Sequence, residues 1–236
     1  MLAANFISEA KRILLPILEE KGATLYSSFN TLSCGKFYVL GLNPGGPADS
    51  GKTLAESLDA LPEQQDNAYL DEDWSSPSRS FGAGRHPLQR HLFELMREIG
   101  QDLRNVCSSN LIFTRSPDLN GADYPSRGHV CWPVHQMILD AVKPNVIIAF
   151  GNGDISPYAF LALKHQESMG VWPEEVTHPA KYWTWQCKAF QTQIQGRDIL
   201  VLGLPHLSRY TITGRPEVVN WIRQTIDAHD QGSQLQ

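Results

Sequence analysis

Short apolar segments with the composition of buried strands alternate along this chain with longer segments of helical periodicity. Such alternation predicts a mainly parallel sheet with helices on both faces, because parallel strands are joined by crossovers that are usually helical. The expected strands are 36–42, 106–114, 145–151 and 199–204, with 182–194 as a half-exposed strand, and the expected helices are 86–100, 131–142, 155–166 and 216–229. We therefore predict an α/β fold, a three-layer α/β/α sandwich with ligand chemistry at the carboxyl ends of its strands.

The length of the chain favours one domain. A chain of 236 residues with 42% hydrophobic residues can bury one substantial core, so we expect a single domain over 1–236 that ends in a polar tail, 230–236. The N-terminal segment is amphipathic and typical of a helix that Pro16 kinks or breaks. No apolar run approaches the roughly 20 residues of a membrane span, and the N-terminus has no small-residue cleavage site. These features predict a cytoplasmic protein without membrane contact.

The cysteines favour the same compartment. Cys34, Cys107, Cys131 and Cys187 lie far apart and form none of the close pairs typical of zinc or redox sites. We expect all of them to be reduced thiols packed in the interior. We predict neither a metal nor a cofactor.

Charge is distributed unevenly. The net charge of -5 argues weakly against a nucleic-acid partner, since phosphate binders usually carry a basic surface. Residues 49–73 hold eight acids against Lys52 alone, whereas residues 79–127 hold seven arginines against five acids. A mixed, solvated surface explains this pattern equally well.

One short string suggests a nucleotide site. Residues 46–53, GPADSGKT, match the triphosphate-binding pattern G-x-x-x-x-G-K-[ST]. Such a loop normally begins where its strand stops, but Asn43, Pro44 and Gly45 intervene here. The other strands also end without the acid that would position a metal ion. A P-loop nucleotide triphosphatase is therefore the less favoured alternative.

Four motifs at strand ends point elsewhere. They are GLNPG at 41–45, SSNLIFTRS at 108–116, KPNVIIAFG at 143–151 and GLPHLSRY at 203–210. Their order, spacing and setting resemble the uracil-DNA glycosylase superfamily over about 36–223, most closely the mismatch-specific and single-strand-selective branches, whose first motif is Gly-x-Asn-Pro-Gly. The resemblance implies a four-stranded central sheet and a DNA glycosylase that flips a pyrimidine, cleaves its N-glycosidic bond and leaves an abasic site.

The resemblance assigns two catalytic residues. Asn43 corresponds to the residue that positions the attacking water; unlike a carboxylate, its amide cannot ionise. His206 corresponds to the histidine that stabilises the departing base, although Leu207 departs from the family's His-Pro-Ser pattern. As a neutral imidazole it would donate to O2 of the base, as an oxyanion-hole group does. The alternative for both residues is a structural role in a turn.

Base recognition is also assigned by resemblance. Asn110 corresponds to the asparagine that reads the N3 and O4 edge of the flipped base, with a buried structural amide as the alternative. Gly41 and Leu42 belong to the same pocket, and Phe81 is the candidate for stacking on the base, with Trp74 and Tyr69 as rivals. In the uracil-specific branch a tyrosine blocks bases substituted at C5. Gly45 stands there in this chain, so thymine or a larger C5-modified pyrimidine should fit.

The last motif predicts the DNA contacts. Ser208 is expected to bond a phosphate, and Arg209 or Tyr210 to enter the space that the flipped nucleotide leaves. The predicted partner is DNA that carries uracil, mismatched thymine or a C5-modified or hypermodified cytosine, and the protein is expected to be a monomer. Its role would be DNA repair or defence against modified foreign DNA. A non-catalytic protein that binds nucleic acid or nucleotides on the same scaffold is the alternative.

Overall fold

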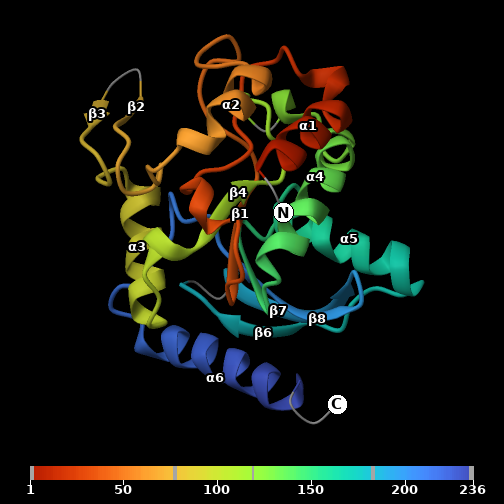
Figure 1. The fold of residues 1–236 in the computed structure, drawn as a ribbon. Coiled ribbons are helices and arrows are strands. Elements are labelled where there is room, and N and C mark those ends of the chain that lie inside the picture. The colour runs from red at the N-terminus through yellow and green to blue at the C-terminus, as the bar shows by residue number, and fades with distance from the viewer. Residues whose placement is uncertain (1–2, 77–78, 119, 182–183, 234–236) are drawn as a thin grey trace.

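The computed structural model describes residues 3–76, 79–118, 120–181 and 184–233, and it has a six-stranded sheet at its centre (Figure 1). The strand order is β4-β1-β5-β8-β7-β6, with bounds Cys107–Asn110, Phe37–Gly41, Val146–Phe150, Arg197–Leu204, Gln186–Ile194 and Val176–Pro179. The first four strands are parallel, and β7 and β6 continue the sheet antiparallel. The predicted α/β class and mainly parallel sheet are confirmed, whereas the predicted number of four strands is wrong.

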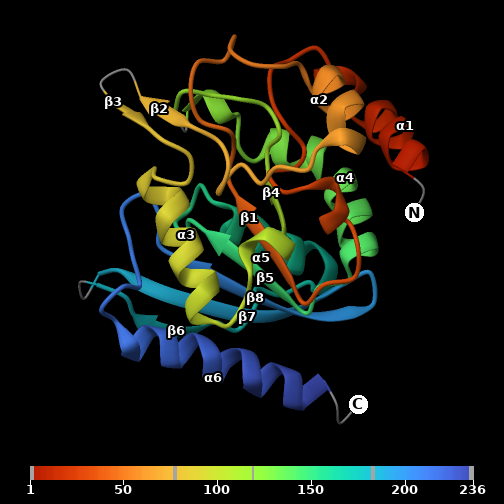
Figure 2. The same cartoon turned by 60° about the vertical axis from the view of Figure 1, so that its left-hand side comes forward.

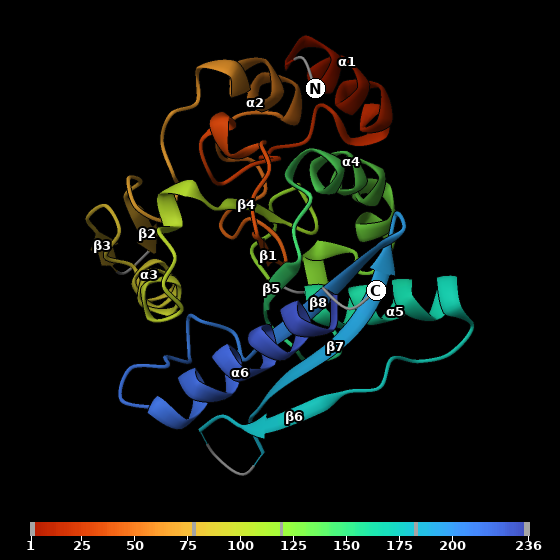
Figure 3. The ribbon, with the colours of Figure 1, turned by 60° about the horizontal axis from the view of Figure 1, so that its bottom comes forward.

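Strand residues divide alternately between two apolar clusters, one on each face of the sheet. On β1, Tyr38 and Leu40 belong to one cluster, and Phe37 and Val39 to the other. The first cluster includes residues of α1 (Ala3–Ile13), α2 (Leu54–Ala60), α4 (Ser126–Val142) and α5 (Pro157–Met169); the second includes residues of α3 (Pro87–Glu98) and α6 (Pro216–Ser233). Figure 3 shows α3 and α6 on one side of the sheet and α4 and α5 on the other. Because both faces are covered, β1 and β5 are almost wholly apolar, whereas β4 is equally buried but carries Ser108, Ser109 and Asn110.

Local signals set several boundaries. The α5 helix begins at a Ser156 cap whose hydroxyl accepts from the Ala159 N–H at 3.0 Å, and it ends at Gly170, where φ is +77°. The turn between β7 and β8 has positive φ at Gln195 and Gly196, as a tight hairpin requires. Short 3₁₀ helices lie at Leu15–Ile17, Phe29–Thr31, Leu61–Glu63, Leu103–Asn105 and Asn120–Ala122.

Some predicted boundaries change. The α4 helix begins at Ser126, earlier than predicted, and accommodates Pro133 in its interior. The α6 helix runs to Ser233, so most of the predicted tail 230–236 is helical, and residues 234–236 lie outside the described part of the chain. Residues 182–183 of the predicted strand 182–194 are also outside it, and β7 begins at Gln186.

The polar segment 47–85 contains a hairpin that has no signal in the sequence. Strands β2 (Trp74–Ser76) and β3 (Arg79–Phe81) pair antiparallel and stand apart from the main sheet (Figure 2). Three cysteines are buried as expected, but Cys34 is exposed. Of the helices that the described residues form, none has both the length and the apolar character to cross a membrane.

Candidate active site

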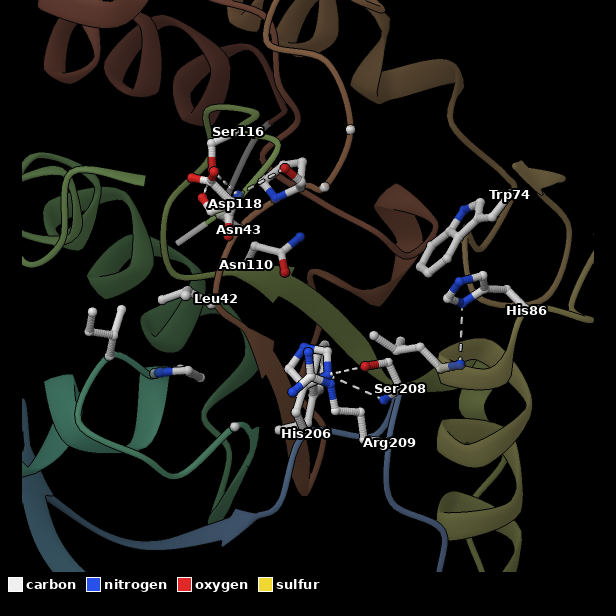
Figure 4. Close-up of a pocket in the computed structure, with 18 of the residues that line it drawn as sticks. Leu42, Asn43, Trp74, His86, Asn110, Ser116, Asp118, His206, Ser208 and Arg209 are labelled. Carbon is white, nitrogen blue, oxygen red and sulfur yellow. Dashed lines mark hydrogen bonds between the residues drawn. The ribbon is translucent and has the colours of Figure 1, made fainter. Parts of the chain in front are cut away.

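A cavity of about 1120 Å³ opens at the carboxyl ends of the four parallel strands (Figure 4). Leu42, Asn43 and Gly45 follow β1, Asn110 ends β4, Phe150 ends β5, and His206, Ser208 and Arg209 follow β8; all of them line the cavity. The parallel arrangement brings these ends to one edge of the sheet, although the residues are far apart in sequence. The cavity therefore collects most of the predicted site residues.

Asn43 is held by its amide nitrogen. Nδ2 donates to the Pro44 carbonyl oxygen at 2.9 Å and to Ser116 Oγ at 2.8 Å. The Ser116 hydroxyl in turn donates to the backbone oxygen of Asp118 at 2.7 Å. Both amide hydrogens of Asn43 are thus engaged, so Oδ1 is the atom that can accept a hydrogen bond from a water.

Asn110 lies against Gly41. The two residues are paired in the register between β1 and β4, and a Cβ on residue 41 would overlap both Asn110 Oδ1 and the Phe150 ring. Gly41 does not line the cavity, but its missing side chain leaves the space in which the Asn110 amide sits. Gly41 therefore contributes to the cavity only indirectly, through the position of Asn110.

The hydrogen bonds of His206 select one tautomer. The backbone N–H of Ser208 points at Nδ1 from 3.2 Å, and Ser208 Oγ lies 2.8 Å from the same nitrogen. Because a backbone N–H can only donate, Nδ1 must be the acceptor. The proton of the neutral ring is therefore on Nε2, which leaves Nε2–H as a donor for a ligand.

The surroundings of His206 keep it neutral. The pKa of His206 is lowered, first by burial and then by the positive charges of Arg209 and His86. His206 as a residue is nevertheless exposed to solvent. His86 caps α3 with Nδ1, which accepts from the Leu88 N–H at 3.3 Å, and burial lowers its pKa as well. Two neutral imidazoles thus line one cavity.

The loop with the triphosphate-binding pattern packs against the side chain of Arg115. Arg115 donates to the Gly45 carbonyl oxygen and lies beside Gly46 and Gly51, both at positive φ. The Thr53 hydroxyl accepts from the Glu56 N–H at 3.1 Å as the cap of α2, so that hydroxyl is already engaged. This geometry argues against a nucleotide cradle at 46–53.

Phe81, the residue predicted to stack on a base, does not line the cavity. The Phe81 ring is not among the residues that line the cavity; it packs 4.9 Å from the His86 ring, with the Arg79 guanidinium 4.8 Å from its centroid. Its rivals Tyr69 and Trp74 do line the cavity, their rings 5.5 Å apart. Phe150 lines it too and touches the Gly41 position next to Asn110. Of the aromatic residue predicted to stack on the base and its rivals, Phe81 thus lies outside the cavity lining, whereas Tyr69 and Trp74 belong to it.

Tyr210 is placed wrongly for a DNA contact. It is 1% exposed, and its hydroxyl donates to the Ala180 carbonyl oxygen at 3.5 Å. Leu207 is also fully buried and anchors the same loop in the core. Their neighbours Ser208 and Arg209 line the cavity. Of the two residues predicted to enter DNA, Arg209 is therefore the one that is exposed.

Several cavity residues were missed by sequence reasoning. Ser116 and Phe150 lie inside the quoted motifs, but nothing in the motifs marks them as cavity residues. Asp118 follows the second motif, and His86 precedes Pro87 at a helix start. Within the described ranges, no cluster of three or more His, Cys, Asp and Glu side chains is placed to hold a metal ion.

Comparison with known proteins adds no assignment. A scan against protein-family models gives no match for this sequence, and a search of curated proteins gives none either. The geometry of the cavity is therefore what supports a function.

Proposed function

We propose that the protein is a monofunctional DNA glycosylase that hydrolyses the N-glycosidic bond of a flipped pyrimidine and leaves an abasic site. The observation that carries the proposal is the cavity itself: Asn43, Asn110 and His206 come from three strand ends and line one space. They offer a water acceptor, an amide for a base edge and an Nε2–H donor for the leaving base.

The uncharged state of His206 suits this reaction. Cleavage moves an electron pair onto the departing base, so a donor aimed at the base oxygen becomes more favourable as the bond breaks. A neutral imidazole fulfils that role without first taking up a proton. The effects that lower the pKa of His206 are consistent with it.

The shape of the cavity supports a large pyrimidine. Its volume of about 1120 Å³ is above the roughly 300–1,000 Å³ common for small-ligand pockets. A Cβ at Gly45 would have no atom within 4 Å, so the chain leaves open space beside that residue. We therefore propose uracil, mismatched thymine or a C5-modified or hypermodified cytosine as the substrate class.

The direct test is base excision. Single-stranded and duplex oligonucleotides that carry each candidate base are incubated with the protein and then treated with alkali, which cleaves at abasic sites. Strand breaks only after alkali would support the proposal. Binding without breaks would instead favour a non-catalytic DNA-binding protein.

Borohydride tests the monofunctional part of the proposal. Among the cavity-lining residues, Lys188 carries the amine that could form a Schiff base, but its Nζ lies 3.5 Å from a Glu175 carboxylate oxygen. We therefore expect borohydride to trap no covalent adduct. A trapped adduct would show a lyase step.

Gly45→Tyr should shift the preference toward uracil. The new ring would occupy the open space and exclude C5 substituents, so we expect at least a tenfold fall in the ratio of C5-substituted to uracil excision. Gly45 is not among the glycines with positive φ, so the backbone accepts a side chain. Circular dichroism checks the fold, and Gly45→Ala is the matched control. An unchanged ratio would show that C5 does not face Gly45.

Arg209→Ala should impair duplex cleavage more than single-strand cleavage. Flipping from a duplex costs unstacking and unpairing, which an inserted side chain offsets, whereas a single strand needs little of this. We expect a loss on duplex at least fivefold larger than on single strands, measured as single-turnover rates. Lys52→Ala removes an exposed cation that does not line the cavity and is the control. Equal losses on both substrates would exclude the wedge.

A further inference from the structure

Hydrolysis of a nucleoside creates positive charge on the sugar and releases a proton from the attacking water. Asn43 orients water but is uncharged, and His206 is already committed as a donor to the base. A carboxylate close to Asn43 could both accept that proton and stabilise the cationic sugar. The acids that line the cavity are Glu72, Asp73 and Asp118.

Asp118 is connected to Asn43 through Ser116. Ser116 is 3% exposed, and its hydroxyl accepts a hydrogen bond from Asn43 Nδ2. The same hydroxyl donates to the backbone oxygen of Asp118. The Ser116 N–H also donates to the Pro44 carbonyl oxygen at 3.1 Å, so the two loops are joined twice. Figure 4 shows Asn43, Ser116 and Asp118 together at one side of the cavity.

The Asp118 carboxylate is positioned but accessible. Its Oδ1 accepts from the Gly121 N–H at 2.9 Å, which orients the group and leaves Oδ2 as the oxygen for a water. The side chain is exposed to solvent, so a water can reach it. A carboxylate within reach of the bound water can act as a general base and also stabilise a cationic sugar.

The other two acids belong to a different wall. Glu72 accepts from Trp74 Nε1 at 3.3 Å, and Asp73 lies between these two residues in the chain. Figure 4 shows Trp74 beside His86, apart from Asn43 and Ser116. Asp73 therefore serves as a matched control, because it lines the same cavity without the link to Asn43.

We propose that Asp118 is the general base of this site, an inference that rests on the proposed glycosylase function. The water oxygen bonds to C1′ of the sugar while the bond from C1′ to the base breaks. The electron pair of that bond leaves with the base, whose oxygen accepts from His206 Nε2–H. The proton of the water passes to the Asp118 carboxylate, and the sugar keeps the hydroxyl. The proton is later returned through solvent to the released base.

Asp118→Asn is the central variant. It keeps the size of the side chain and an Oδ1 acceptor for the Gly121 N–H, so a purely structural role would survive the change. We expect the single-turnover excision rate to fall at least tenfold while the Kd for DNA stays within twofold. Asp73→Asn removes a carboxylate from another wall of the same cavity, and its excision rate should fall at least fivefold less than that of Asp118→Asn.

Rescue of the excision rate by formate would distinguish a catalytic role of Asp118 from a structural one. In Asp118→Ala, added formate can occupy the vacated space and take the proton, so it should restore part of the lost rate. It should not restore Asn43→Ala, which lacks the water acceptor. Sodium chloride at the same ionic strength is the control.

The outcomes separate the two proposals. An active wild type with undiminished Asp118→Asn would overturn the role of Asp118 and leave the glycosylase proposal standing. Equal losses in Asp118→Asn and Asp73→Asn would also overturn it, because the loss of negative charge in the cavity would then explain both. A failure of formate to restore the rate would overturn it as well, because a structural effect of the substitution would then explain the loss. A wild type that excises no pyrimidine would overturn the glycosylase function and this inference with it.

Discussion

His206→Ala is expected to slow excision by on the order of 10² to 10³-fold, which corresponds to about 2.7–4 kcal/mol of transition-state stabilisation. The reason is the tautomer: the Ser208 N–H fixes Nδ1 as an acceptor, so Nε2–H is the donor available to the leaving base. Alanine removes that donor where negative charge develops. The measurement is the single-turnover rate at saturating protein, so that weaker binding does not contribute.

Two further variants test whether this loss in excision rate comes from the missing N–H donor. His206→Gln keeps a side-chain N–H donor and should retain more activity than His206→Ala. His129→Ala removes an imidazole on α4 that contacts Lys164 and does not line the cavity, and it should excise at the wild-type rate. DNA affinity of His206→Ala should stay within a few-fold of the wild type. A rate for His206→Ala within threefold of the wild type would remove His206 from the mechanism.

Asn43→Ala is expected to cause a loss of similar size, on the order of 10² or more, because the water that attacks C1′ would lose its acceptor. The substitution should lower the stability of the fold only slightly. Although the amide donors to Pro44 and Ser116 are lost, the Ser116 N–H still bonds the Pro44 carbonyl oxygen at 3.1 Å and holds the two loops together. Single-turnover rates and thermal unfolding of the same preparation measure the two effects separately.

Asn43→Asp distinguishes water positioning from loop structure. Aspartate loses the two amide donors but keeps an oxygen that accepts from water, so it should excise faster than Asn43→Ala. If loop structure alone explained the loss, the two variants would be equally slow. That result would return Asn43 to the role of a turn residue before Pro44.

The periodic parts of the chain could be predicted from sequence. Strands β1, β5 and β8 carry apolar residues on both faces, because helices cover both sides of the sheet. The residue types of these segments therefore indicate their burial. Asn43, Asn110 and His206 were singled out by resemblance, and the parallel sheet explains why they meet. Each lies at or just beyond a strand end, and parallel strands bring such ends together.

Elements without periodicity could not be predicted. The edge strand β6 is largely exposed and carries Val176 at 53% exposure, so it has no alternation to detect. The β2–β3 hairpin is short and polar. Such elements form because a neighbouring strand or turn provides hydrogen bonds, and that information lies outside the segment itself.

Among aromatic residues, only tertiary packing decided which ones line the cavity. Phe150 and Tyr210 belong to motifs and Phe81 lies between the first two, yet Phe150 lines the cavity, Tyr210 is buried with β7 and α6 residues, and Phe81 packs on His86. The same holds for Asp118, whose link to Asn43 spans two loops. The sequence by itself determined the fold class and the strand ends, because burial selects residue type. The tertiary structure decided which side chains share the cavity, because that depends on contacts between distant segments.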